Sequence, residues 1–156
     1  MNTRPPPATA DADIDHLVHT ATAAHAALMQ GDIDRHLHHI RISSDFTLMA
    51  PFGGPPSRAA TFTGQRWVEI GRFFEAGRDS TLELVQAYRS GELAVLVAIE
   101  RTVAEVGALA AQPWALRVTL VFRREAGQWQ LAHRHADPLV EGISLEQAAA
   151  LAAGRA

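Results

Sequence analysis

Residues Trp114 to Val140 read WALRVTLVFRREAGQWQLAHRHADPLV, two apolar-rich stretches joined at Glu125-Ala126-Gly127. Their aliphatic and aromatic residues, separated by a small-residue turn, predict a long antiparallel hairpin. The densest group of proton-transferring and anion-binding side chains outside the expected helices ends the second stretch: His133, Arg134, His135 and Asp137. The hairpin therefore indicates both a sheet and a polar site at one end of it.

Composition limits the class of protein. The chain has 156 residues, 47% of them hydrophobic and 20% charged, which suits one domain with a real core. With a formal charge of −3 and no basic stripe, neither nucleic acid nor an anionic membrane surface is an expected partner. The longest apolar run, Leu93 to Ile99, is far shorter than the roughly 20 residues of a membrane-spanning helix. There is no cysteine, so disulfides and thiolate chemistry are excluded and the redox compartment stays open. The first residues lack the apolar core of a secretory signal, so a soluble protein with the cytoplasm as default location is expected.

The order of elements predicts helices first and strands afterwards. Helices are expected over Asp11–Gln30, over a short segment capped by Asp32, and over Gly64–Ala76. Strands are expected over Ser44–Met49, Thr81–Arg89, Glu92–Val106 and the two arms of the hairpin, forming a single antiparallel sheet. Three segments follow: a disordered leader over residues 1–11, one folded domain over 12–143, and a short C-terminal helix and tail over 144–156, opened by a Ser144/Gln147 capping box. That last helix is expected to pack on the sheet or to fray.

From about residue 12 to 140, this order resembles the nuclear-transport-factor-2-like, or cystatin-like, α+β cone fold. The specific likeness lies in the hairpin, where Arg117-Val118-Thr119, Gly127-Gln128-Trp129 and His133-Arg134-His135 are similar to motifs of SnoaL-like proteins. The association domain of calcium/calmodulin-dependent kinase II is similar over the same stretch. The resemblance implies an α+β fold in which a curved antiparallel sheet wraps around N-terminal helices and leaves a hollow between them.

Fold resemblance alone does not give function, because this family includes polyketide cyclases, ketosteroid isomerases and non-catalytic assembly domains. Ketosteroid isomerases place a general-base Asp where this chain has Ala50. Their oxyanion-binding Tyr would fall near Ala24 or His25, and their protonated Asp near Thr119. Standard ketosteroid isomerisation is therefore not expected.

Strand alternation places every second residue from Trp129 to Asp137 on one face, including Leu131, His133 and His135, and Arg134 on the other. A three-residue loop over Glu125–Gly127 would pair Thr119 with His133 and Arg117 with His135, assembling all four on that face. A four-residue loop would instead pair Thr119 with Ala132 and Arg117 with Arg134, separating Arg117 from the histidines.

The first register makes His133 and His135 the candidate catalytic residues, with Arg117 and Thr119 as candidate ligand-binding residues. An arginine beside two neutral imidazoles suits a carboxylate or enolate and allows proton transfer near neutral pH. The alternative is that these histidines fill a dimer face or bond to backbone carbonyls.

Three more residues are candidates for binding a ligand: Trp67, His36 and Tyr88. Trp67 lies on the apolar face of the third helix, His36 beside an apolar helix face, and Tyr88 on a strand at the expected rim. The alternative is a purely structural role: Trp67 in the core, His36 at the core boundary, and Tyr88 closing the core with its hydroxyl at the rim. Glu100 and Arg101 interrupt an apolar strand, so one of them should face the cavity or a partner subunit and the other solvent.

The spacing of the histidines also makes a metal-binding site worth considering. His16 with His19, and His36 with His39, have the i, i+3 spacing that can bring two imidazoles to one ion. No zincin-type Glu follows, and the apolar pattern assigns His19 and His39 to solvent, so no metal is expected. No Gly-rich phosphate loop supports a nucleotide, and no cofactor is expected.

Together these features predict a small-molecule-binding, homodimeric SnoaL-like protein with an apolar pocket. Its ligand would be a small organic molecule such as a carboxylate or ketone, and acid/base turnover of isomerase, cyclase or dehydratase type is left open. The alternative is a non-catalytic dimeric association module. A weaker third reading is a histidine-dependent metal-binding protein.

Overall fold

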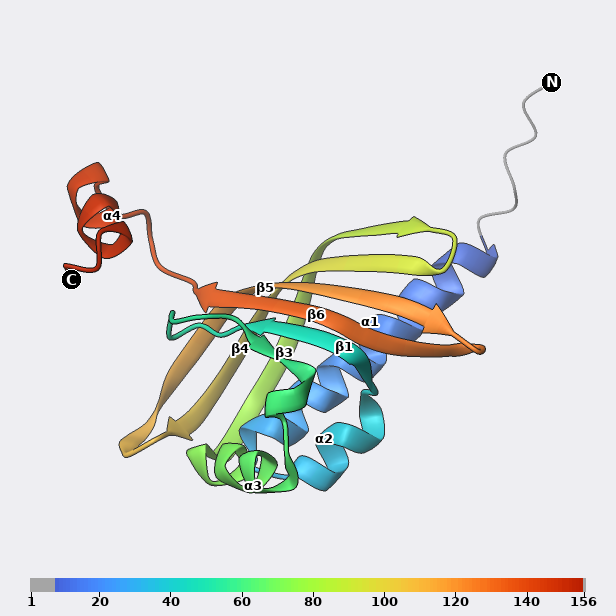
Figure 1. Ribbon diagram of the computed structural model, residues 1–156, viewed down its shortest axis with the longest axis horizontal. Helices are drawn as coiled ribbons and strands as arrows, with labels where there is room; N and C mark the ends of the chain where they lie inside the picture. Colours follow the sequence, from blue (N-terminus) through green and yellow to red (C-terminus); the bar gives the residue numbers. More distant parts are fainter. Residues whose placement is uncertain (1–7, 156) are drawn as a thin grey trace.

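The computed structural model describes residues 8–155 and contains helices followed by long strands (Figure 1). The helices are α1 (Ala8–Met29), α2 (Ile33–His39), the short η1 (Ala59–Thr61), α3 (Gly64–Phe73) and α4 (Leu145–Ala152). The strands are β1 (Ile42–Met49), β2 (Ser57–Arg58), β3 (Phe74–Ser90), β4 (Leu93–Val106), β5 (Leu109–Glu125) and β6 (Gln128–Pro138). Of the leader expected over residues 1–11, residues 1–7 lie outside the described part, and α1 begins at Ala8. None of the helices within residues 8–155 has the length and apolar character that a bilayer crossing requires.

All six strands form one curved, unclosed sheet in the order β2-β1-β6-β5-β4-β3. The α+β prediction is confirmed, and the pairings among β3, β4, β5 and β6 are antiparallel as expected. One pairing differs from the expectation, because β1 runs parallel to β6. These two strands are far apart in the sequence, so no hairpin fixes their relative direction.

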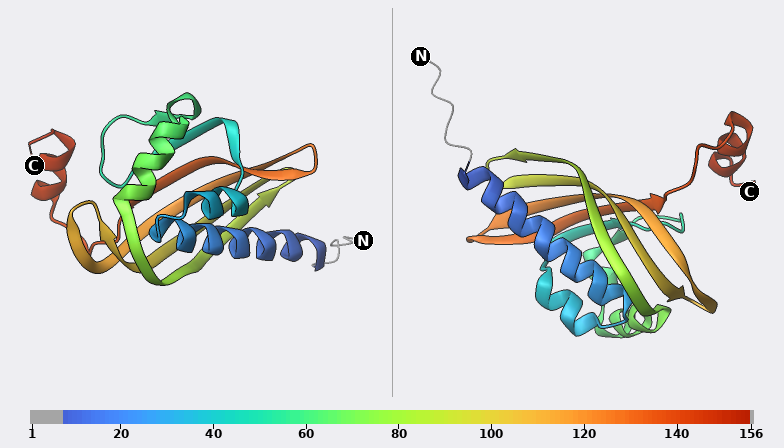
Figure 2. Two further views of the ribbon diagram at one scale, coloured as in Figure 1. Left: turned by 90° about the horizontal axis from the view of Figure 1, so that it is seen from below. Right: turned by 180° about the vertical axis from the view of Figure 1, so that it is seen from behind.

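The helices α1, α2 and α3 lie against the concave face of this sheet (Figure 2). α1 packs along β3 and β4, and its buried residues join the inward side chains of the sheet in one main core. The largest of these core side chains with 2% exposure or less are Leu17, Leu96, Leu120 and Phe122. Glycine is required where β3 passes the end of α1, because a Cβ at Gly77 would lie 2.6 Å from the backbone carbon of Met29.

The register of the closing hairpin differs from both predicted alternatives. Its loop is only Ala126-Gly127, with φ of 48° and 74°, the positive values that two-residue hairpin turns need. A β-bulge at Ala132 then shifts the ladder, so that Phe122 pairs with Leu131 but Val121 pairs with His133.

This bulge reverses the strand alternation. Leu131 and Arg134, three residues apart, both face the helices. His133 and His135 face away from them, where His135 pairs with Thr119. The prediction that one face carries every second residue from Trp129 to Asp137 is therefore wrong, because an unpaired extra residue moves all later side chains to the other side.

The C-terminal helix α4 has the predicted capping box, in which the Ser144 hydroxyl accepts from the Gln147 amide and the Gln147 side chain accepts from the Ser144 amide. It does not pack on the sheet but stands apart from it (Figure 1). Leu145 and Leu151 are exposed accordingly. Of the two expected outcomes, packing on the sheet or fraying, packing on the sheet is wrong, because the chain turns away after Pro138.

Candidate functional site

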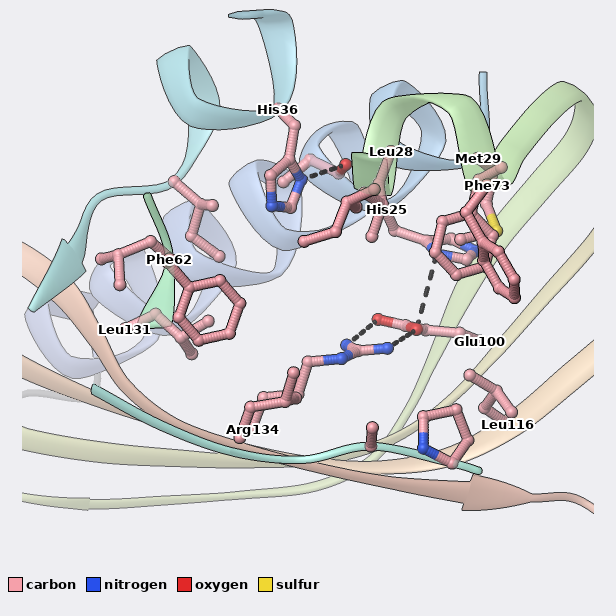
Figure 3. A pocket seen from close by; sticks show the side chains of 18 of the residues that line it. His25, Leu28, Met29, His36, Phe62, Phe73, Glu100, Leu116, Leu131 and Arg134 are labelled. Carbon is pink, nitrogen blue, oxygen red and sulfur yellow. Dashed lines mark hydrogen bonds and ion pairs between the residues drawn. The ribbon is translucent and has the colours of Figure 1, made fainter. Parts of the chain in front are cut away.

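A cavity of about 420 Å³ lies between the three helices and the concave face of the sheet (Figure 3). Its walls come from α1, α2, α3 and strands β1, β3, β4, β5 and β6, and most of the lining side chains are aliphatic or aromatic. Representative wall residues are Leu28, Phe46, Phe62, Ile70, Leu116 and Leu120. A cavity of this size with mostly apolar walls is typical of small-molecule sites.

An ion pair between Glu100 of β4 and Arg134 of β6 supplies the charge inside this apolar space. The guanidinium donates to both carboxylate oxygens over 2.8 and 2.6 Å, and Glu100 is only 2% exposed. Burial alone would raise the pKa of Glu100, but the charge and hydrogen bonds of Arg134 lower that pKa to about 2. Glu100 is therefore ionised and its charge is compensated.

His25 of α1 lies beside this pair and is 4% exposed. Its Nε2 lies 3.4 Å from the backbone oxygen of Arg101, and its Nδ1 lies 3.5 Å from Oε2 of Glu100. Burial lowers the pKa of His25, while the negative charge of Glu100 opposes that shift. Both ring nitrogens thus face acceptors, and a neutral ring carries only one proton with which to serve them.

His36 of α2 enters the cavity from the helical side, across from the Glu100–Arg134 pair on the sheet (Figure 3). Its Nδ1 lies 2.8 Å from the Ala24 carbonyl oxygen, so Nδ1 carries the proton and donates it. The Trp67 ring packs against the imidazole at a centroid distance of 5.9 Å and fixes its tilt. Burial lowers the pKa of His36, so the ring is neutral near pH 7 and Nε2 presents a lone pair.

Aromatic side chains close one end of the cavity. Phe52, in the loop after β1, packs against Phe73 and Trp114 at centroid distances of 5.5 and 5.9 Å. Phe52 is 57% exposed, so this cluster lies between the cavity and solvent. The buried Nε1 of Trp114 has no hydrogen-bond partner among the described residues.

The residues singled out from the hairpin lie elsewhere. His133, His135, Arg117 and Thr119 share the outer face of the sheet, and none of them lines the cavity. Arg117 instead donates two hydrogen bonds to Asp137, at 2.7 and 2.8 Å, and the Thr47 hydroxyl lies 2.7 Å from Nδ1 of His133. The expectation that these residues converge on the pocket is wrong, because the bulge at Ala132 turns the hairpin histidines to the outer face of the sheet.

The three remaining candidates divide between the cavity and the surface. Trp67 and His36 line the cavity. Tyr88 lies on the edge strand β3, pairs with Val95 on the outer face and is 59% exposed, so it does not reach the cavity. Its expected position at the cavity rim is wrong, because α1 packs on the inner face of β3 while the Tyr88 side chain lies on the outer face.

Sequence reasoning left open the role of Glu100 and missed those of Arg134 and His25. Of the two neighbouring charged residues, Glu100 is buried and Arg101 is exposed, as expected because adjacent strand residues face opposite sides of a sheet. A buried carboxylate in an apolar strand requires a buried cation as its partner. From this requirement the sequence could have predicted that an arginine such as Arg134 faces the cavity. Within residues 12–155, no three His, Asp or Glu side chains gather closely enough to hold a metal ion.

Comparisons with known proteins agree with this architecture. A family model described as SnoaL-like domain matches residues 17–141. No curated protein matches the chain significantly.

Among solved structures, a candidate dehydratase from the NTF2-like family of Streptomyces avermitilis has a TM-score of 0.69 at 20% identity, covering 85% of this chain and 100% of its own. An NTF2-like superfamily protein from Salmonella enterica serovar Typhimurium has a TM-score of 0.69 at 14% identity, covering 88% and 99%. A candidate calcium/calmodulin-dependent kinase II association domain from Thiobacillus denitrificans has a TM-score of 0.58 at 21% identity, covering 78% and 93%. At such identities these similarities show the shared fold alone.

Proposed function

The chain belongs to the SnoaL-like domain family, and on that premise we propose that it binds a small, largely apolar organic molecule in the cavity between helices and sheet. One observation carries the proposal: a cavity of about 420 Å³ with apolar walls encloses a buried ion pair and two imidazoles. Apolar walls supply affinity, and a few fixed polar groups supply orientation.

The buried polar groups support this proposal because they contribute little to folding. A buried ion pair costs several kcal/mol of desolvation per ion and is often no more stabilising than apolar residues of similar volume. An internal hollow also leaves its lining atoms without packing partners. A cavity that combines both features is better explained by an occupant than by stability.

Acid/base turnover of isomerase, cyclase or dehydratase type is the catalytic form of the proposal. A neutral imidazole can accept a proton at neutral pH, and His25 and His36 are the two that line the cavity. The outward His133 and His135 would act only on a ligand bound to the other side of the sheet. Catalysis inside the cavity would therefore use His25 or His36 rather than the hairpin histidines.

A pair of neighbouring residues offers a direct test of binding. Leu116 faces the cavity and Arg117 faces outward, so Leu116→Trp fills the cavity while Arg117→Trp leaves it open. Ketones, alcohols and carboxylates with apolar bodies would be screened by thermal shift against wild type and both variants. A cavity ligand should raise the melting temperature of wild type and Arg117→Trp but not of Leu116→Trp. Equal stabilisation of both variants would rule the cavity out as the binding site.

The second candidate function is dimeric association, and the outer face of the sheet favours it. There Val95, Val97, Ile99 and Val121 form a half-buried β-branched patch. A second copy covering this patch would make the expected homodimer. Sedimentation of wild type and Val97→Lys would test it, since a dimer that persists in Val97→Lys would not use this face.

A further inference from the structure

The charged side chains that line the cavity are all paired with one another. Arg134 and Glu100 compensate each other in the interior, and Arg66 and Glu69 of α3 lie 3.7 Å apart near the exposed edge. A ligand carboxylate would enter beside the ionised Glu100, where the described lining residues offer no arginine or lysine that is not already paired. A ligand ammonium would meet Arg134 without a free carboxylate. Burying either ion without a counter-charge is costly, so these pairs select an uncharged occupant.

The orientation of His36 adds a requirement for a hydrogen-bond donor. Because Nδ1 donates to the Ala24 carbonyl oxygen, the neutral ring has its lone pair on Nε2. Nε2 has no hydrogen-bond partner among the described residues, and the ring points into the cavity (Figure 3). Burial, which lowers the pKa of the ring, keeps this nitrogen an acceptor at neutral pH.

Packing holds the ring in this orientation. The 2.8 Å bond to Ala24 anchors one edge of the imidazole, and Trp67 contacts the ring from α3. An acceptor fixed in an apolar space gains most from a neutral hydrogen-bond donor such as an O–H group, since a neighbour without a donor leaves it desolvated and unpaired.

We propose, building on the proposed function, that the ligand of this cavity is an uncharged molecule carrying a hydroxyl group, an alcohol, phenol or enol, whose O–H donates to Nε2 of His36. The apolar body of the ligand lies against the aromatic and aliphatic walls. The Glu100–Arg134 pair excludes ionised ligands of the same shape. This choice distinguishes hydroxyl compounds from the carboxylates and ketones that the sequence suggested.

Three naphthalenes of similar size serve as probes in isothermal titration calorimetry: 2-naphthol, 2-methoxynaphthalene and 2-naphthoate. Only the first is a neutral donor. Wild type should bind 2-naphthol roughly fivefold or more tighter than 2-methoxynaphthalene, as expected for one net hydrogen bond, and 2-naphthoate weakest. Tighter binding of 2-naphthoate than of 2-naphthol would overturn the inference.

His36→Asn isolates the role of Nε2. An Asn amide can still donate to Ala24 from near the position of Nδ1, but no acceptor remains at the position of Nε2. The preference for 2-naphthol should disappear while the affinity for 2-methoxynaphthalene stays within about twofold. His38→Asn is the matched control, because His38 lies on the same helix, is exposed and does not line the cavity. An unchanged preference in His36→Asn would refute the role of Nε2.

A measurement on wild type keeps the inference testable if His36→Asn folds poorly. The ¹⁵N resonance of His36 Nε2 should shift when 2-naphthol is added and stay nearly constant with 2-methoxynaphthalene. Equal binding of these two compounds would overturn this inference and leave the proposed function standing. Failure of all three probes to bind wild type would overturn both.

Discussion

Replacing Arg134 by methionine tests whether the charge inside the cavity is as isolated from solvent as its geometry indicates. Methionine retains the length of the side chain but leaves the Glu100 carboxylate, 2% exposed, without its two hydrogen bonds of 2.8 and 2.6 Å. Breaking a buried pair by removing one partner costs about 3–5 kcal/mol. At about 2–4 °C per kcal/mol for a domain of this size, the melting temperature should fall by roughly 6–20 °C.

The hairpin provides a matched control for burial. Arg117 makes the same two-bond contact with Asp137, at 2.7 and 2.8 Å, but its side chain is 63% exposed. Water replaces the lost contact in Arg117→Met, so this variant should be far less destabilised than Arg134→Met. The double variant Glu100→Leu/Arg134→Met should recover most of the lost stability, because no charge then remains buried.

Urea unfolding followed by tryptophan fluorescence and circular dichroism gives the free energies for all four proteins. In Arg134→Met the pKa of Glu100 rises, so stability is retained below the ordinary pKa of that group and is lost as the pH rises through its folded value. The destabilisation should therefore be smaller at pH 5 than at pH 8. Equal effects of Arg134→Met and Arg117→Met, or a double variant no more stable than Arg134→Met, would refute the reasoning.

Three further measurements follow from the structure. Burial lowers the folded-state pKa of His25 and His36 below 6.5. Their contribution to the free energy of unfolding is therefore fully present above pH 6.5 and is lost as the pH falls toward the lowered pKa values. Urea titrations from pH 7 to 5 should show this decrease in stability, and the decrease should be smaller in His36→Asn. Gly77→Ala places a methyl group against the Met29 backbone and should cost about 1–3 kcal/mol in thermal unfolding, whereas an equal loss in the unconstrained Gly142→Ala would contradict the close approach. Ser144→Ala should speed amide hydrogen exchange in α4 without changing global unfolding, at a cost to that helix of about 1 kcal/mol.

The fold could be predicted from the sequence because its signals are local and repeated. Helical spacing, caps at Asp32 and Ser144, and long apolar strands each specify an element without reference to the rest of the chain. The parallel pairing of β1 with β6 has no such local signal, since it depends on contacts between distant segments.

The site was harder to predict because it depends on one residue of register. Ala132 carries no property that marks it as a bulge, yet its insertion decides that Arg134 faces the cavity and His133 does not. Glu100 was the more reliable indicator, because a carboxylate inside an apolar strand is costly without a partner. His25 was not predicted as a site residue, because a single histidine on an apolar helix face carries no information about which side chains of the sheet it will contact.

The cavity also governs how the molecule responds to compression. Hydrostatic pressure favours the state of smaller volume, and unfolding eliminates whatever space stays unfilled in the cavity of about 420 Å³. The native protein should therefore unfold at lower pressure than Leu116→Trp, in which the added ring occupies part of that void. An occupant of any chemical class would raise the unfolding pressure in the same way, so high-pressure fluorescence can report when the cavity is filled before the ligand has been identified.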